Sequence, residues 1–334
     1  MKAIALIPFR NEEFFLPACL ESLRGVADEV LGFDDGSIDS SKAIFESYGG
    51  LVKSSLSGRS GWSQGKEAEI RNSLLTWGRE RGGTHFIWLD ADEAFTANFR
   101  EKARALMHSL QPGHKLLLQW LALWKKPSVY RTDGHWKDVF KDFIVCDTPD
   151  ATMHEGFVHF GRTHGLNTPE MLHNVPLEEG AVLHFQYAEW ERFQLKQCWY
   201  RCVELRRMPR TEEELNTKYA FTLGDSAALC TAVPANWTDG LPLPSDTVNE
   251  WPLSWHLAEV EAMFREEGAE YFEGLDIWHV PEIHSLFVAM TGREPDQQAK
   301  IKKSKLQRTV REACKKLLPE FCVNVLRGLK KRGR

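Results

Sequence analysis

Two carboxylates stand one residue apart directly after an apolar run in the first third of this 334-residue chain. Asp90 and Asp92 follow Phe86–Leu89, which has the length and composition of a buried strand. Since both side chains then leave the end of one strand, they point toward the same ligand. Paired hard oxygen donors on a rigid support suit Mn²⁺ or Mg²⁺, which completes its shell with phosphate oxygens and water. The alternative is a helix N-cap with acidic residues in the first turn.

Two earlier segments rich in polar residues also follow apolar runs. Pro8–Glu13 comes after the expected strand Lys2–Pro8, and Phe33–Asp39 comes after the expected strand Glu29–Phe33. In a parallel sheet the carboxyl ends of the strands meet at one edge, and ligands bind there. We therefore expect both segments to lie beside the aspartate pair.

The elements that must hold these residues alternate between strand and helix. Helical spacing of apolar residues predicts helices over Glu12–Leu23, Ser40–Tyr48 and Glu67–Arg81, and a third strand or loop begins at Leu51. This alternation predicts an α/β fold with a mainly parallel sheet flanked by helices. Later in the chain we expect strands at Lys115–Leu123, Phe140–Val145 and Ala181–Phe185, and helices at Glu189–Arg207, Ser254–Glu267 and from Gln297 onward.

In order and spacing these segments resemble the successive motifs of family 2 glycosyltransferases of the GT-A fold. Gly65–Ala68 leading to Arg71 supplies a further motif, and Leu89–Glu93 (Leu-Asp-Ala-Asp-Glu) is similar to a subgroup of lipopolysaccharide-core-type transferases. The resemblance covers roughly residues 3–95 and continues more loosely to about residue 205. It implies a GT-A (Rossmann-like) domain with a C-terminal helical extension.

The resemblance also implies roles for individual residues. The residues implied to hold the nucleotide are Pro8, Arg10, Asn11, Glu12, Asp34, Asp35, Arg71 and Asp90, with Asp35 favoured for the base and Arg71 placed near the diphosphate. The implied ligands of Mn²⁺ or Mg²⁺ are Asp90, Asp92 and His184, with Asp92 the more direct. For His184 the alternative is a hydrogen-bonded core histidine.

The reaction implied is the metal-dependent transfer of a hexosyl group from a nucleoside-diphosphate-sugar to a hydroxyl, with inversion of configuration. The leaving diphosphate gains negative charge, which a cation and an arginine stabilise. The acceptor hydroxyl must lose a proton to a base. Glu155 is the preferred candidate, with Asp138 and Asp142 as rivals, and each has the alternative role of a solvated loop acid. The expected acceptor is a surface or lipid-linked glycan.

Two other functions compete with this interpretation. A sugar-1-phosphate nucleotidyltransferase needs a Gly-rich basic loop after its first strand, where this chain has Phe9–Glu13. A non-catalytic nucleotide- or glycan-binding module on the same fold would be expected to lose the metal-binding carboxylates, yet Asp90 and Asp92 are both present.

Charge is distributed unevenly along the chain. The net charge is −5, but residues 300–334 carry thirteen Lys/Arg against Glu312 and Glu320, so this tail is +11 and the remainder is −16. So acidic a body argues against a nucleic-acid partner. The tail has apolar residues at three- and four-residue spacing, which predicts a basic amphipathic helix on an anionic membrane surface. The alternative is that its apolar face packs on its own domain.

The lengths of the apolar runs and the positions of the prolines predict the localisation and the domains. No apolar run reaches the roughly 20 residues that span a bilayer, and no export signal is expected, so the protein is predicted to be cytoplasmic or peripheral on the inner face of the membrane. We expect a GT-A domain over residues 1–230, with a nucleotide-binding half (1–115) and an acceptor half (116–230). A Pro-rich linker and helical extension (231–299) and the basic tail (300–334) then follow.

Overall fold

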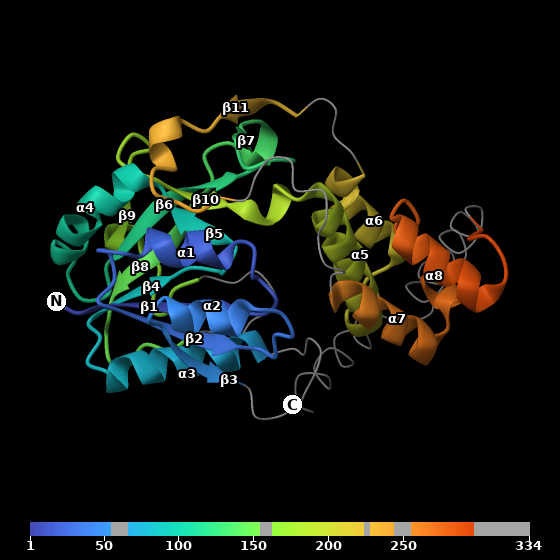
Figure 1. Ribbon diagram of the computed structural model, residues 1–334, viewed down its shortest axis with the longest axis horizontal. Coiled ribbons are helices and arrows are strands. Elements are labelled where there is room, and N and C mark those ends of the chain that lie inside the picture. Colours follow the sequence, from blue (N-terminus) through green and yellow to red (C-terminus); the bar gives the residue numbers. More distant parts are fainter. Residues whose placement is uncertain (55–65, 154–161, 224–227, 244–254, 297–334) are drawn as a thin grey trace, which may run out of the picture. The chain divides into compact units, whose positions relative to one another are not determined.

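The computed structural model describes residues 1–54, 66–153, 162–223, 228–243 and 255–296 (Figure 1). The chain forms two compact units: the first contains Met1–Phe193 and Ala227–Trp251, and the second contains Gln194–Ser226 and Pro252–Arg334. Each unit is described by itself. Residues 194–226 thus group with the second unit, whereas the sequence placed them in the first domain; the predicted boundaries at 230 and 299 stay predictions.

The first unit is built on a nine-stranded mixed sheet. Its strand order is β3-β2-β1-β4-β8-β6-β10-β5, with β9 beside β6. Strands β1, β2, β3 and β4 pair in parallel, as do β6, β9 and β10, whereas β8 and β5 are antiparallel to their neighbours. The strands are β1 (Ala3–Phe9), β2 (Glu29–Asp34), β3 (Leu51–Ser54), β4 (His85–Trp88), β5 (Glu93–Phe95), β6 (Lys115–Ala122), β8 (Phe140–Cys146), β9 (Leu172–Asn174) and β10 (Ala181–His184). A separate pair contains β7 (Val129–Arg131) and β11 (Cys230–Ala232).

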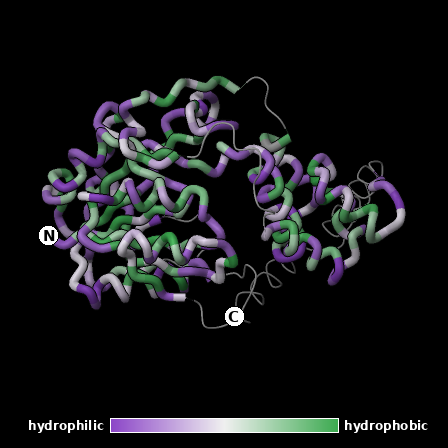
Figure 2. Tube along the Cα trace, viewed as in Figure 1, coloured by the Kyte–Doolittle hydropathy of each residue, from purple (hydrophilic) through white to green (hydrophobic). Residues whose placement is uncertain are grey.

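Helices cover both faces of this sheet, because β1 is apolar on both of its faces. Ile4 and Leu6 join a core cluster with Leu74 of α3, whereas the ring of Phe9 stacks on Phe45 of α2 at 5.1 Å between centroids. In Figure 2 the hydrophobic residues concentrate along these central strands. The helices are α1 (Leu16–Ser22), α2 (Ser41–Ser47), α3 (Lys66–Glu80) and α4 (Ala97–His108). The predicted α/β class, with a mainly parallel sheet flanked by helices, is confirmed.

One glycine sets how closely α2 approaches the sheet. A Cβ at Gly32 in β2 would lie 2.6 Å from the ring of Phe45, so a larger residue would push the helix away. This close packing holds α2 against β2, and so it also holds the turn that joins them. This turn carries the acidic residues of the site.

The second unit is helical, and the helices predicted at Glu189–Arg207 and Ser254–Glu267 are present as α5 (Trp190–Arg207) and α7 (Trp255–Glu267). It contains most of α5, then α6 (Glu212–Lys218), α7 and α8 (Pro281–Thr291). Thr211 and Glu214 form a capping box that begins α6. Short 3₁₀ turns lie in the first unit at Gly134–Trp136, Pro169–Met171, Phe185–Tyr187 and Ala235–Trp237, and in the second at Ala220–Thr222 and Ala269–Phe272. Among the described residues, none of the helices is long and apolar enough to cross a membrane.

Several elements were not predicted from the sequence: α4, α6, α8, β7, β9, β11 and β5, of which β5 matters most for the site. It begins at Glu93, immediately after the aspartate pair, and runs antiparallel to β10 with Glu93 opposite His184. A three-residue strand is too short to show a periodic pattern, so the acidic run looked like a loop. The helix predicted from Gln297 onward lies outside the described residues.

Candidate functional site

The segments after β1 and β2 are joined by hydrogen bonds into one structure. The amide of Ile38 donates to Asn11 Oδ1 (2.8 Å), and the amide of Asn11 donates to Ser37 Oγ (3.0 Å). Asp34 is buried and accepts from the Ser37 amide (2.8 Å), so it shapes the turn. Asn11 has φ = 54°, a left-handed conformation that asparagine tolerates better than most residues. The two predicted nucleotide-binding segments therefore lie together at the strand ends.

The remaining predicted nucleotide residues lie around this structure. Asp35 is half-buried, and its Oδ1 is 2.7 Å from Lys66 Nζ at the start of α3. Pro8 pairs with Phe33 in the β1–β2 register, and Arg10 follows directly after β1. Glu12 Oε2 lies 3.1 Å from Arg192 Nη2. Each position is at the same edge of the sheet.

Arg71 of α3 reaches the first aspartate of the pair. Its Nε donates to Glu67 (3.0 Å) and its Nη2 donates to Asp90 Oδ1 (2.9 Å). Its Nη1 is buried and has no hydrogen-bond partner among the described residues. A buried guanidinium with one donor unused fits an anionic ligand such as a phosphate oxygen.

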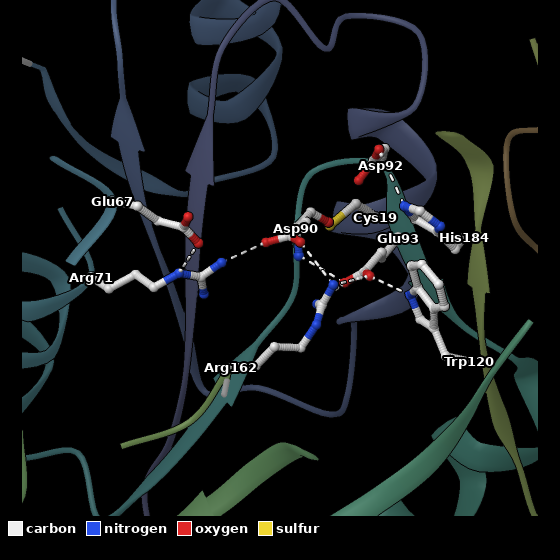
Figure 3. A network of polar contacts seen from close by, with 9 residues as sticks. All are labelled: Cys19, Glu67, Arg71, Asp90, Asp92, Glu93, Trp120, Arg162 and His184. Atoms are coloured by element: carbon white, nitrogen blue, oxygen red, sulfur yellow. Dashed lines mark hydrogen bonds and ion pairs between the residues drawn. The ribbon is translucent and has the colours of Figure 1, made fainter. Parts of the chain in front are cut away.

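A second arginine, Arg162, binds the same aspartate from the opposite side (Figure 3). Its Nη2 donates to Asp90 Oδ2 (2.8 Å) and to Glu93 Oε1 (2.5 Å), and its Nη1 bonds Glu93 Oε2. Burial by itself would raise the pKa of Asp90, but the charges of Arg162 and Arg71 outweigh it and lower that pKa to about 2. Both oxygens of Asp90 are thus occupied by arginines.

Glu93 anchors the network from inside. Its side chain is fully buried and accepts hydrogen bonds from Trp120 Nε1 (2.6 Å) and from the Asp90 amide (2.9 Å), besides those from Arg162. The Trp120 ring stacks on His184 at 4.0 Å between centroids. Lys141, on β8, places its Nζ 3.2 Å from the centre of the Trp120 ring. Burial, followed by the charge of Arg162, lowers the pKa of Lys141 to about 8. Trp120 therefore orients His184.

The β5–β10 pairing places His184 beside Asp92. The amide of Phe185 donates to the Asp92 carbonyl (2.9 Å), and His184 Nε2 lies 3.5 Å from Asp92 Oδ2. Both residues are buried, and His184 Nδ1 has no hydrogen-bond partner in the described part of the chain. A carboxylate oxygen beside an imidazole nitrogen fits Mn²⁺, with the other positions left for water and phosphate. The described residues contain no group of three metal-ligating side chains.

The residues predicted as catalytic base lie differently. Asp142 Oδ2 accepts from Thr163 Oγ1 (2.5 Å) and is 3.8 Å from the buried Lys115 Nζ. Asp138 Oδ1 lies 3.4 Å from Gln119 Nε2. Glu155 lies outside the described residues. All three roles stay predictions, and neither described acid belongs to the network around Asp92.

Three residues in this region escaped the sequence analysis. Arg162 follows a loop-rich stretch without a motif, and Glu93 was read only as the last letter of the acidic run. Glu189, which precedes α5 by one residue, is buried close to Asp92. An acid five residues after a strand-end histidine was the available signal for Glu189, but its environment is set by packing between distant elements.

Comparison with solved structures gives distant similarities. The crystal structure of S. aureus TarS residues 1–349 matches at 16% identity and a TM-score of 0.37, over 86% of this chain and 84% of that chain. The same protein in complex with UDP-GlcNAc matches at 18% identity and 0.36, over 66% and 73%. M. tuberculosis glucosyl-3-phosphoglycerate synthase with Mn²⁺ and UDP-glucose matches at 18% identity and 0.27, over 36% and 43%. In a longer TarS structure the match spans 44% of that chain's length.

Sequence comparison gives one family match, over the first part of the chain. None of the curated proteins compared matches this chain. The family model described as glycosyl transferase family 2 matches residues 4–113, which contain β1 to α4, Arg71, the aspartate pair and Glu93. The similarity to glycosyl transferase family 2 thus covers residues 4–113, about a third of the chain.

Proposed function

We propose that this chain is a glycosyltransferase that moves a sugar from a nucleoside-diphosphate-sugar to a hydroxyl acceptor. The observation that carries the proposal is the juxtaposition of Asp92, which lies in the segment that matches the family model, with His184, at a distance of 3.5 Å. Arg71, with one buried donor unused, lies on the other side of Asp90 from Arg162. Cation-binding and anion-binding groups thus meet at one edge of the sheet.

The chemistry of the transfer explains this arrangement. As the bond between the sugar and the diphosphate breaks, negative charge grows on the leaving oxygen. Asp92 and His184 would hold a divalent cation, for which we propose Mn²⁺ or Mg²⁺, and this ion would supply stabilisation of that charge. Arg71 adds a fixed positive charge, and Asp90 orients both arginines. The segments at Asn11 and Asp35 lie where the base and ribose would be bound.

We further propose that the transferred group is a hexose and that transfer inverts its configuration. A direct displacement by the acceptor oxygen needs only one chemical step at the anomeric carbon, so inversion follows from it. The proposed acceptor is a surface or lipid-linked glycan. Donor turnover does not depend on knowing this acceptor, because water can take its place slowly.

The function is tested with a panel of nucleotide-sugars. We expect the full chain with Mn²⁺ to release nucleoside diphosphate from at least one donor, and chelation by EDTA to stop the release. UDP-GlcNAc and UDP-glucose are suitable first members. Formation of pyrophosphate from a nucleoside triphosphate and a sugar-1-phosphate would indicate a nucleotidyltransferase, whereas binding without turnover of any donor would indicate a non-catalytic module.

The basic tail supports a second proposal, that the protein associates with the inner membrane surface. Deleting residues 300–334 removes thirteen cationic side chains, so we expect much weaker sedimentation with vesicles of phosphatidylcholine and phosphatidylserine. Donor turnover should persist in the truncated chain. Equal sedimentation of both chains at low salt would contradict the anchor, and loss of the difference at high salt would confirm its electrostatic origin.

A further inference from the structure

Glu189 is a buried acid to which the described structure gives no hydrogen-bond partner. It lies between the 3₁₀ turn after β10 and the first residue of α5, and its side chain is 5% exposed. Neither carboxylate oxygen accepts a hydrogen bond from a described residue. An unsatisfied buried carboxylate is strongly unfavourable, so a group retained in this state requires an explanation.

The neighbouring arginine does not supply the missing partner. Arg192 Nη1 is 3.9 Å from Glu189 Oε2, too far for a hydrogen bond. The same guanidinium donates to the Asn11 carbonyl (2.8 Å) and lies 3.1 Å from Glu12 Oε2. Arg192 is therefore bound to the segment after β1, and it holds that segment next to Glu189.

The electrostatic surroundings connect Glu189 to Asp92. Burial raises the pKa of Glu189 to about 9, against the lowering effect of Arg192, and the negative charges of Glu12 and Asp92 raise it further. The groups that act on Glu189 thus come from the first turn of α5, from the segment after β1 and from the turn between β4 and β5. These are the elements that carry the proposed nucleotide and metal residues.

An aromatic cluster adjoins Glu189 and contains a second unsatisfied group. Trp190 follows Glu189 in the chain, and its ring lies 5.2 Å from that of Trp124 between centroids. Tyr187 stacks on Trp124 at 5.7 Å, and Trp124 Nε1 is buried with no hydrogen-bond partner among the described residues. Aromatic rings next to free polar groups are suited to a ligand that is apolar on one face and carries hydroxyls, as a sugar is.

We propose that Glu189 binds the acceptor hydroxyl and takes its proton during transfer. The inference rests on the proposed glycosyltransferase function. As the acceptor oxygen bonds to the anomeric carbon, its O–H bond breaks and the proton passes to the Glu189 carboxylate. The bond from the anomeric carbon to the diphosphate breaks at the same time, and its electron pair leaves on the diphosphate oxygen. Glu189 later gives the proton to water.

Other described acids are less suited to this role. Asp142 is bound to Thr163 and faces Lys115, and Asp138 is close to Gln119. A carboxylate that already accepts hydrogen bonds would have to break them before it could receive a hydroxyl, whereas Glu189 accepts none from the described residues and has only the 3.9 Å ion pair with Arg192.

The test compares Glu189→Gln with Glu191→Gln in the full chain. Glu191 is exposed in the first turn of α5, so its substitution makes the same change of charge outside the site. We expect Glu189→Gln to lower release of UDP from the active donor by about 10²–10⁴-fold, the usual contribution of a general base. The affinity for UDP with Mn²⁺ should stay within about twofold of wild type, and Glu191→Gln should resemble wild type in both measurements.

Two further readouts separate a base from a structural group. Azide attacks the anomeric carbon without losing a proton, so we expect it to restore donor consumption by Glu189→Gln, with formation of a glycosyl azide. Wild-type turnover should rise with pH, because the carboxylate acts only when it is deprotonated, and Glu189→Gln should lose this rise.

Three outcomes would overturn the assignment. Near-wild-type turnover of Glu189→Gln would exclude a catalytic role. Loss of both turnover and UDP binding would show that Glu189 has a structural role. Failure of azide to restore any turnover in a folded, UDP-binding variant would also contradict proton removal. If the wild-type chain itself turns over no donor, the proposed function fails, and the role of Glu189 fails with it.

Discussion

Asp92→Asn is expected to lower donor turnover by about 10²–10³-fold at saturating nucleotide-sugar, the loss that follows removal of one group stabilising a developing charge. The substitution keeps the size of the side chain and removes the negative charge next to His184 Nε2, 3.5 Å away. The affinity for Mn²⁺ in the presence of UDP should fall as well, since an amide is a poorer ligand for a hard cation.

The measurement is release of nucleoside diphosphate from the active donor over a titration of Mn²⁺. Asp150→Asn is the matched control, because Asp150 is exposed and its substitution makes the same change of charge. If Asp92→Asn merely disturbed the fold, its thermal unfolding would shift and added Mn²⁺ would recover nothing. Wild-type turnover in this variant would show that the cation, if used at all, is held elsewhere.

The three acids at positions 90, 92 and 93 have different partners, and this difference is the reason for testing Asp92. Asp90 has both oxygens on arginines, and Glu93 is fully buried under Arg162 and Trp120. Asp92 is left to face His184 across the β5–β10 pairing. Three carboxylates within four residues therefore have three different environments, and that difference comes from what packs against each one.

The sequence predicted the parts of this site that are local in the chain. β1, β2 and β4 were recognisable as apolar runs, and each is followed by the polar segment that the structure places at the sheet edge. The adjacent residues Asp34 and Asp35 show what local sequence patterns cannot predict. Both looked like ligand-binding acids, yet Asp34 accepts the Ser37 amide within its own turn, while Asp35 faces Lys66.

The parts that could not be predicted depend on contacts between distant segments. Arg162 is 72 residues from Asp90, and no spacing rule joins a loop arginine to an aspartate at a strand end. β5 is three residues long and is defined by its pairing with β10 rather than by a pattern of its own. The environment of Glu189 likewise arises only when α5 meets the segment after β1, through Arg192 and Asn11.

Arg162→Met is expected to lower the free energy of unfolding by about 3–5 kcal/mol, the usual effect of removing one partner from a buried ion pair. Glu93 is fully buried, and without Arg162 its charge would keep only the hydrogen bonds from Trp120 and the Asp90 amide. Methionine fills most of the space of the arginine stem, so the loss reports mainly the uncompensated charge. Urea unfolding followed by circular dichroism measures it, with Arg104→Met at a 40%-exposed pair changing stability by less than about 1 kcal/mol.

Adding Glu93→Gln to Arg162→Met tests the cause of that loss. Glutamine removes the buried negative charge and still accepts from Trp120, so the double variant should be more stable than Arg162→Met alone. A double variant that loses the sum of the two single effects would show that Arg162 acts through packing and not through charge. The same series links stability to function, because Arg162 also holds Asp90. Glu93→Gln alone leaves Arg162 bound to Asp90 and should keep donor turnover closer to wild type than Arg162→Met does, since only the latter releases the carboxylate that orients Arg71.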